Sequence, residues 1–191
     1  MMTQDVDVKI ILEQYYPAAA LRCMEANGTT IVVLQPSQTF SEVSPALRRL
    51  APGIDRWPIP PAGLFVTEER TIYLRSKSPM TVCHEAGHAL DSALGGGVYL
   101  SGIDPKIRRA FAAASAFVTP YAASACDEYF AESVRAWIGA NDPHSLWPRV
   151  TRERLATVDP RMFGIVSQLF TQVESRFSGS AMATSAKGSF A

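Results

Sequence analysis

Two histidines and one glutamate at helical spacing are the residues of this chain best suited to chemistry. The segment 81–91 reads TVCHEAGHALD, so His84 stands four residues before His88, and Glu85 directly follows the first histidine. Residues i and i+4 lie on one face of a helix, where two imidazoles can bind one metal ion. A glutamate beside them can reach a water that the metal activates. The pattern favours a site for one Zn²⁺ ion per chain over a solvated helix face that happens to hold two histidines.

The third ligand of such a site must come from elsewhere in the chain. A catalytic zinc ion takes three protein ligands and keeps a fourth position for water. His144, the remaining histidine, lies in a proline-flanked loop, whereas Glu128 and Glu132 stand four residues apart on an expected helix. One carboxylate can bind the metal, and the other can accept the ring N–H of a ligating histidine. An exposed polar helix face is the alternative interpretation of this pair.

Residues beside the motif have further expected roles. Asp91, three residues after His88, is either a second acceptor for a ring N–H or an acid on the helix surface. Cys83 and Cys126 flank site residues in the sequence, and we expect both to be small buried hydrophobes.

Two helices must position these side chains. Ser78 is a candidate N-cap and Pro79 a first helical residue for a helix that runs to about residue 94, where three glycines stop it. Ser124 is the expected start of a second helix over 124–138, which carries both glutamates. The glycine-rich loop 95–104 is either a mobile lid or a plain helix stop and turn.

A strand and a hairpin are expected before the first of these helices. Residues 29–34 are rich in β-branched side chains, and 63–66 and 71–74 form the arms of a hairpin that follows a proline-rich connector. Residues 6–16 fit a strand or a helix equally well. The remaining expected helices cover 18–27, 41–50, 105–118 and 160–177.

The first hairpin strand is a candidate substrate-binding edge. A free strand edge can pair with an extended peptide, with backbone hydrogen bonds for affinity and side-chain pockets for specificity. We therefore expect a protein or peptide substrate bound as an extended strand along Gly63, Leu64 and Phe65. Ordinary hairpin structure without a binding role is the alternative.

Composition narrows the function classes. The chain has 191 residues, of which 47% are hydrophobic and 19% charged, a globular profile of one domain. Lys and Arg number 18, as do Asp and Glu, which argues against nucleic-acid binding and against a polybasic membrane-surface protein. We expect neither nucleic acid nor membrane as a partner, and the sequence does not indicate an oligomeric state.

Three cysteines and the N-terminal residues bear on localisation. An odd, sparse set of cysteines is no disulfide framework, which favours a reducing compartment. The start of the chain lacks the basic, then long apolar, pattern of a signal peptide, and the uncharged stretch 110–126 is too weakly apolar to span a membrane. We expect a cytoplasmic protein. Export by a non-standard route, or a secreted protein trimmed of its signal, is the alternative.

The segment HEAGHALD, followed by Y-x6-E-Y-F-A-E over 121–132, resembles the catalytic domain of anthrax lethal factor and the related Pro-Pro endopeptidases. The resemblance covers roughly residues 60–175. It implies a gluzincin-type zinc site with His84, His88 and Glu128 as ligands.

The same resemblance implies the catalytic roles of two residues. Glu85 would be the general base. Tyr121, seven residues before the third ligand, would donate a hydrogen bond to the oxyanion.

Residues and resemblance together predict an α+β, zincin-like metallopeptidase domain. We expect a small mixed β-sheet with an edge hairpin, then the active-site helix and a mostly helical C-terminal half. One domain would cover residues 1–177, with an α/β part over 1–50 and a catalytic core over 60–175, before a disordered tail over 178–191. The predicted function is a zinc-dependent endopeptidase. The alternatives are a catalytically silent, metal-stabilised binding or regulatory module, and a zinc hydrolase of a non-peptide amide.

Overall fold

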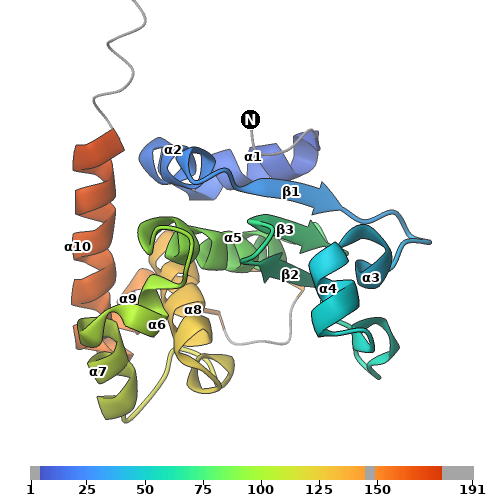
Figure 1. The fold of residues 1–191 in the computed structure, drawn as a ribbon. Coiled ribbons are helices and arrows are strands. Elements are labelled where there is room, and N and C mark those ends of the chain that lie inside the picture. The colour runs from blue at the N-terminus through green and yellow to red at the C-terminus, as the bar shows by residue number, and fades with distance from the viewer. Residues whose placement is uncertain (1–4, 145–148, 178–191) are drawn as a thin grey trace, which may run out of the picture.

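The computed structural model describes residues 5–144 and 149–177, arranged as Figure 1 shows. The expected tail over 178–191 lies outside the described residues. Three strands form one sheet in the order β1-β3-β2, with β1 (Thr30–Val33) parallel and β2 (Gly63–Val66) antiparallel to β3 (Thr71–Leu74). The sheet is therefore mixed, and β2 lies at its edge.

Helices make up most of the rest, and the predicted α+β fold class is confirmed. Among the described residues, no helix is both long and apolar enough to cross a membrane. The α-helices are α1 (Val6–Tyr15), α2 (Ala18–Ala26), α3 (Phe40–Val43), α4 (Pro45–Leu50), α5 (Pro79–Leu94), α6 (Leu100–Ile103), α7 (Pro105–Ala113), α8 (Cys126–Ile138), α9 (Arg152–Val158) and α10 (Pro160–Phe177), and the 3₁₀ turns are η1 (Ile54–Arg56) and η2 (Tyr121–Ala123).

Helix α5 lies at the centre of the molecule. The Ser78 hydroxyl accepts a hydrogen bond from the Thr81 N–H, and Pro79 occupies the first turn, as the sequence predicts. The helix packs against α1, α2 and both hairpin strands, and against α8 on its other side (Figure 1). Gly87 makes the α5–α8 contact close, because a Cβ there would lie 3.1 Å from the Cα of Ala131. The two helices that carry the metal-ligand candidates are thus held face to face.

Alternate residues of the hairpin face two separate groups of buried apolar side chains. Ile72 belongs to the larger group, which also contains side chains of α1, α2, α5, α8 and α10. Tyr73 belongs to a smaller group with Phe40 and Ile54 under α3, α4 and η1. The period-two alternation of a strand explains this division. The packing of Tyr73 with Phe40 and Ile54 also holds the segment that leads from η1 into the edge strand.

The open choice for residues 6–16 is settled in favour of a helix. The Asp5 carboxylate accepts a hydrogen bond from the Val8 N–H at 3.1 Å and caps α1. Val8 and Leu12, one turn apart, are its buried residues. Alternation suggested a strand, but packing of one helical face decides the outcome.

The single helix expected over 41–50 was wrong, because the chain forms two short helices, α3 and α4. Ser44 between them is extended, which follows from the Pro45 ring after it. The Ser44 hydroxyl accepts a hydrogen bond from the Leu47 N–H and donates one to Glu69 at 2.6 Å. A distant carboxylate thus stabilises the break.

The helix expected over 105–118 ends earlier, at the end of α7. Phe117 packs against the ring of Tyr129, with centroids 5.7 Å apart. The Val118 carbonyl accepts a hydrogen bond from Arg154 at 3.0 Å. These contacts with α8 and α9 hold the chain extended where a helix would carry it away.

The helix expected over 124–138 also begins two residues later than predicted. The Ser124 hydroxyl donates to the Tyr121 carbonyl at 2.7 Å and closes η2, so it does not cap α8. Ala125 is the N-cap residue instead. Glu128 still falls in the first turn of α8, as its predicted role requires.

Candidate metal centre

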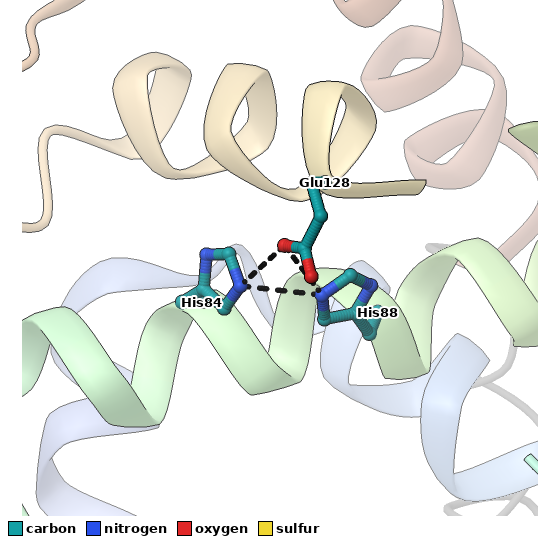
Figure 2. A group of neighbouring side chains, drawn as sticks. All are labelled: His84, His88 and Glu128. Carbon is teal, nitrogen blue, oxygen red and sulfur yellow. Dashed lines mark hydrogen bonds and ion pairs between the residues drawn. The ribbon is translucent and has the colours of Figure 1, made fainter. Parts of the chain in front are cut away.

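His84, His88 and Glu128 converge on one point between α5 and α8 (Figure 2). Both Nε2 atoms turn toward the glutamate, with His84 Nε2 3.0 Å and His88 Nε2 3.2 Å from Glu128 Oε2. The two Nε2 atoms are 3.2 Å apart, and the ligand atoms of all three residues lie within 4.8 Å of one another. Two imidazole nitrogens and one carboxylate oxygen fit a catalytic zinc ion.

The electrostatics of this cluster favour a cation. Burial by itself would lower the pKa of His84, but hydrogen bonds with Glu128 and Glu132 outweigh it and raise this pKa to about 10. Burial acts to raise the pKa of Glu128, yet hydrogen bonds with His84 and His88 hold it well below its usual value. Carboxylates therefore dominate the local potential and stabilise positive charge between the rings.

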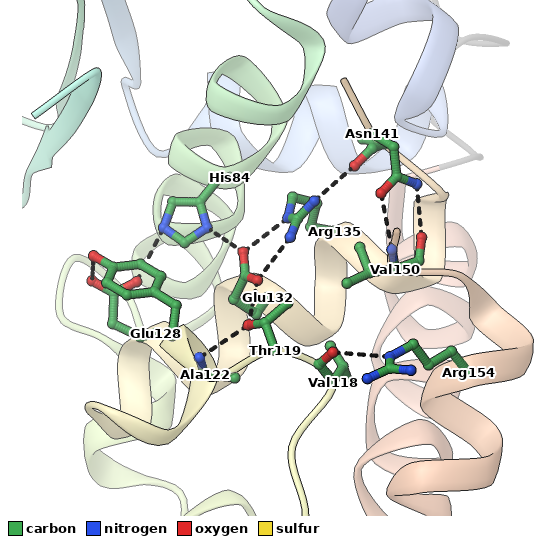
Figure 3. A network of polar contacts seen from close by, with 12 residues as sticks. His84, Val118, Thr119, Ala122, Glu128, Glu132, Arg135, Asn141, Val150 and Arg154 are labelled. Atoms are coloured by element: carbon green, nitrogen blue, oxygen red, sulfur yellow. Dashed lines mark hydrogen bonds and ion pairs between the residues drawn. The ribbon is translucent and has the colours of Figure 1, made fainter. Parts of the chain in front are cut away.

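The structure separates the roles of the two glutamates on α8. Whereas Glu128 faces both Nε2 atoms, Glu132 Oε1 lies 2.9 Å from Nδ1 of His84 (Figure 3). The Thr119 hydroxyl donates to the other oxygen of Glu132 at 2.7 Å. An acceptor at Nδ1 fixes the ring orientation and leaves Nε2 for the metal.

Arg135 is a residue of this network that sequence reasoning missed. Its Nε and Nη2 atoms each donate to Glu132 at 2.8 Å, and its Nη1 atom donates to the Ala140 carbonyl at 3.2 Å. The guanidinium is only 2% exposed and neutralises a carboxylate that is equally buried. The i,i+3 spacing of Glu132 and Arg135 on the expected helix was the signal that could have revealed it.

Glu85 lies next to the edge strand. It is buried, and burial raises its pKa, while a backbone hydrogen bond with Phe65 acts in the opposite direction. Gly63 leaves the space that the glutamate occupies, because a Cβ at that position would lie 2.8 Å from Glu85 Cγ. The site therefore contains an acidic group held against the strand by steric fit.

Tyr121 borders the same cluster from η2. Its hydroxyl donates to Glu128 Oε1 at 2.8 Å, and its ring centroid lies 5.6 Å from that of His84. The side chain is 43% exposed, so it reaches solvent as well as the cluster.

Both interpretations of Asp91 from the sequence are wrong. It is fully buried, so it is no surface acid, and it accepts hydrogen bonds from the N–H and hydroxyl of Ser101 at 2.8 and 2.5 Å. Burial raises its pKa to about 6. Within the described chain, Nδ1 of His88 is buried without a hydrogen-bond partner, so Asp91 is not the acceptor of that ring N–H. The contact between Asp91 and Ser101 instead joins α6 to α5. Helix α6 lies within residues 95–104, where the sequence predicted a loop.

Other candidate donors lie outside the cluster. The His144 N–H donates to Asp142, and this histidine is absent from the cluster of ligand atoms. Cys83 is buried, and burial raises the pKa of its thiol to about 12. Cys126 is half-buried and donates to the Ser101 carbonyl.

Strand β2 lies at the edge of the sheet, next to Glu85. The Ala62 carbonyl accepts hydrogen bonds from the N–H groups of Arg75 and Ser76 on the β3 side. Since backbone groups alternate sides along a strand, Gly63 and Phe65 present theirs to the outer edge, where the Phe65 backbone contacts Glu85, and the backbone groups of Leu64 face β3. Of the three residues expected to bind substrate, Gly63 and Phe65 present backbone groups to the outer edge and Leu64 does not, and the binding itself stays a prediction.

A cavity of about 430 Å³ opens beside the metal-ligand cluster. His84, Glu85 and Tyr121 line it, together with the proline-rich segment after η1. Its lining residues are Trp57, Ile59, Pro60, Pro61, Ala62, Gly63, Met80, Thr81, His84, Glu85, Tyr121, Glu132 and Arg135.

Comparison with solved structures identifies a protein of similar fold. No family model and no curated protein matches the sequence. Among solved structures, the chain is similar to the Pro-Pro endopeptidase PPEP-2 from Paenibacillus alvei, with a TM-score of 0.60 and 21% sequence identity over 85% of this chain and 88% of that chain. At this identity the likeness shows a metallopeptidase-like fold, and it extends over more of the chain than residues 60–175.

Proposed function

We propose that the protein is a zinc-dependent endopeptidase of the gluzincin type. The observation that carries the proposal is the convergence of His84, His88 and Glu128 next to Glu85, at the open edge of a sheet. The fold shared with a Pro-Pro endopeptidase supports the same activity. A protein or peptide bound as an extended strand is the substrate that this edge would accept.

Three ligands and two further side chains divide the chemistry. His84, His88 and Glu128 would hold one Zn²⁺ ion, which when bound polarises a carbonyl and acidifies water. Glu85 would take a proton from the attacking water on its carboxylate and then donate it to the leaving amine. Its raised pKa suits both halves of that transfer. The Tyr121 hydroxyl would turn from Glu128 to donate to the oxyanion of the tetrahedral intermediate.

Replacement of the base tests this function. We expect Glu85→Gln to keep zinc, since Glu85 is not among the converging ligands, but to lose at least about 10²-fold in peptide hydrolysis. The measurement is zinc content beside cleavage of a peptide library, read by mass spectrometry. Glu174→Gln, on α10 away from the site, is the matched control.

The outcomes separate the function from its alternatives. Full activity of Glu85→Gln would rule out Glu85 as the base. A zinc-loaded wild-type protein that cleaves no peptide would contradict the proposal and favour a silent, metal-stabilised module. Cleavage that a chelator abolishes and zinc restores supports it.

A further inference from the structure

The cavity beside the metal-ligand cluster has an apolar wall that the proposed chemistry does not use. Trp57, Ile59 and Met80 contribute large apolar side chains, and Pro60 and Pro61 stiffen the segment between Ile59 and the edge strand. The volume of about 430 Å³ falls within the range of pockets that bind small ligands. It is much larger than an alanine or a proline side chain requires.

Exposed apolar groups collect at this cavity. Trp57 is 54% exposed and Ile59 is 86% exposed, and Tyr121, which lines the same cavity, is 43% exposed. Exposed apolar side chains that gather at one place on a protein mark a binding surface. A ligand that covers these apolar side chains would gain binding free energy from the area removed from water.

Each charged side chain that lines the cavity is either paired with an opposite charge or negative. Arg135 is paired with Glu132, and both are almost fully buried. His84 contacts two carboxylates, and Glu85 adds a third acidic group to the lining. Among the described side chains that line the cavity, none is an unpaired cation, and the Glu85 carboxylate repels an acidic group.

The position of the cavity relates it to a peptide on the sheet edge. Gly63 both lines the cavity and begins β2, and its backbone groups face the outer edge. A peptide paired with this edge would direct every second side chain to the same side. One of them would enter the cavity beside Glu85, next to the reacting carbonyl.

We propose that this cavity selects one large, uncharged apolar side chain, such as leucine, methionine or phenylalanine, adjacent to the scissile bond. The inference rests on the proposed function and names its specificity. Trp57, Ile59 and Met80 are then specificity-determining residues, and an acidic side chain is excluded at that position.

A hydroxamate series tests the inference by binding, apart from turnover. N-capped amino-acid hydroxamates with glycine, alanine, proline, leucine, phenylalanine or aspartate side chains are titrated into the zinc-loaded full chain by calorimetry. The chelating group fixes each ligand at the metal, so the side chain probes the cavity. We expect leucine and phenylalanine to bind about tenfold or more tightly than alanine and proline, with aspartate weakest.

A cavity-filling variant makes the test specific. Ala62 lines the cavity with an exposed side chain, so Ala62→Trp would fill the cavity without disturbing the core. It should abolish the preference for leucine and phenylalanine. Ala112→Trp, at an exposed position of α7 that does not line this cavity, should leave the preference intact.

The results distinguish this inference from the proposed function. Equal affinity across the series, or a preference that survives Ala62→Trp, would overturn the cavity assignment alone. Graded affinity in a protein that cleaves no peptide would support the cavity assignment and contradict the peptidase function. No zinc-dependent binding of any hydroxamate would overturn both.

Discussion

At the scale of single residues, the buried Glu132 decides how His84 can be used. Its carboxylate holds Nδ1 of the ring, and it stays ionised because Arg135 and Thr119 donate to it. Burial acts to raise the pKa of Glu132, but the hydrogen bonds from His84 and Arg135 lower it well below its usual value. A ligand ring with a fixed orientation binds metal without the entropy loss of ordering it.

Arg135 donates two parallel hydrogen bonds to Glu132, and this forked contact gives a prediction at the scale of a single residue. Arg135→Lys keeps the charge but loses the two parallel hydrogen bonds to Glu132. We expect zinc affinity to fall by about tenfold while the protein stays folded. Competition with a chromophoric chelator measures the affinity, and Arg152→Lys is the control, since that side chain donates to the Trp137 carbonyl and lies over the Trp137 ring. Unchanged affinity in Arg135→Lys would show that the fork does not position the ligand.

At the scale of elements, the close fit between β2 and α5 positions Glu85, the proposed general base. Gly63→Ala would bring a Cβ within 2.8 Å of Glu85 Cγ and 3.0 Å of Thr81 Cγ2, so Glu85 or the strand must shift. A displacement of about 1 Å can cost about 10²-fold in rate, and we expect a loss of that order in kcat with zinc content unchanged.

A second glycine supplies the control for that experiment. A Cβ at Gly164 on α10 would have no atom within 4 Å apart from its chain neighbours and its own helix backbone, so Gly164→Ala should keep full activity. Equal kcat for wild type and Gly63→Ala would contradict the steric account of the base.

The segment that forms the apolar wall depends on Asp55 in η1. Its carboxylate accepts hydrogen bonds from the N–H groups of Phe40 and Ser41, and it pairs with Arg75 at 2.6 Å. Burial acts to raise the pKa of Asp55, but these hydrogen bonds outweigh it and lower the pKa below the usual 3.8. A single carboxylate thus joins α3, η1 and the end of the hairpin.

The sign of this pKa shift fixes a pH dependence. Because the pKa is lower in the folded state, the stabilisation is fully present above pH 3.8 and is lost as pH falls through the folded value. Asp55→Asn should lower the free energy of unfolding at pH 7 by about 2 kcal/mol, and this difference should shrink toward pH 3.

Urea denaturation between pH 7 and pH 3 measures that difference. Glu68→Gln, which breaks only an exposed pair with Arg49, should change stability by less than about 1 kcal/mol. A difference between wild type and Asp55→Asn that is independent of pH would show that the ionised carboxylate is not the cause.

Local signals predicted some elements well and others badly. The cap and proline at the start of α5, and the hairpin 63–74, follow from short-range chemistry that the sequence displays directly. The break at Ser44 was missed although Pro45 is a local signal for it, and Glu69, far along the chain, adds to its stability. Helix α6 was missed because Asp91 anchors it through Ser101.

The candidate site shows the same division. His84 and His88 depend only on helical spacing, and the structure places their Nε2 atoms side by side. Neither the roles of Glu128 and Glu132 nor the partner of Asp91 could be fixed by spacing, because they depend on how α8 and α6 pack against α5. The cavity also joins distant segments, so no single motif could reveal it.

At the scale of the whole molecule, α5 joins the two halves of the site. The hairpin before it brings the edge strand to Glu85, and α8 after it brings Glu128, the proposed third ligand, to the histidines. Gly87 permits the close approach of α5 and α8 on which that third ligand depends. A bound ion would therefore link helices that are far apart in the sequence and stabilise their packing.

Zinc content of the purified, zinc-loaded and dialysed protein tests the central claim most directly, with Glu128→Ala beside wild type. We expect about one zinc per chain in wild type and a clear loss in the variant, since a catalytic zinc ion needs three protein ligands. Asp127→Ala, one residue away and outside the ligand cluster, should retain the metal. Zinc retained by Glu128→Ala, or absent from wild type after loading, would contradict the account.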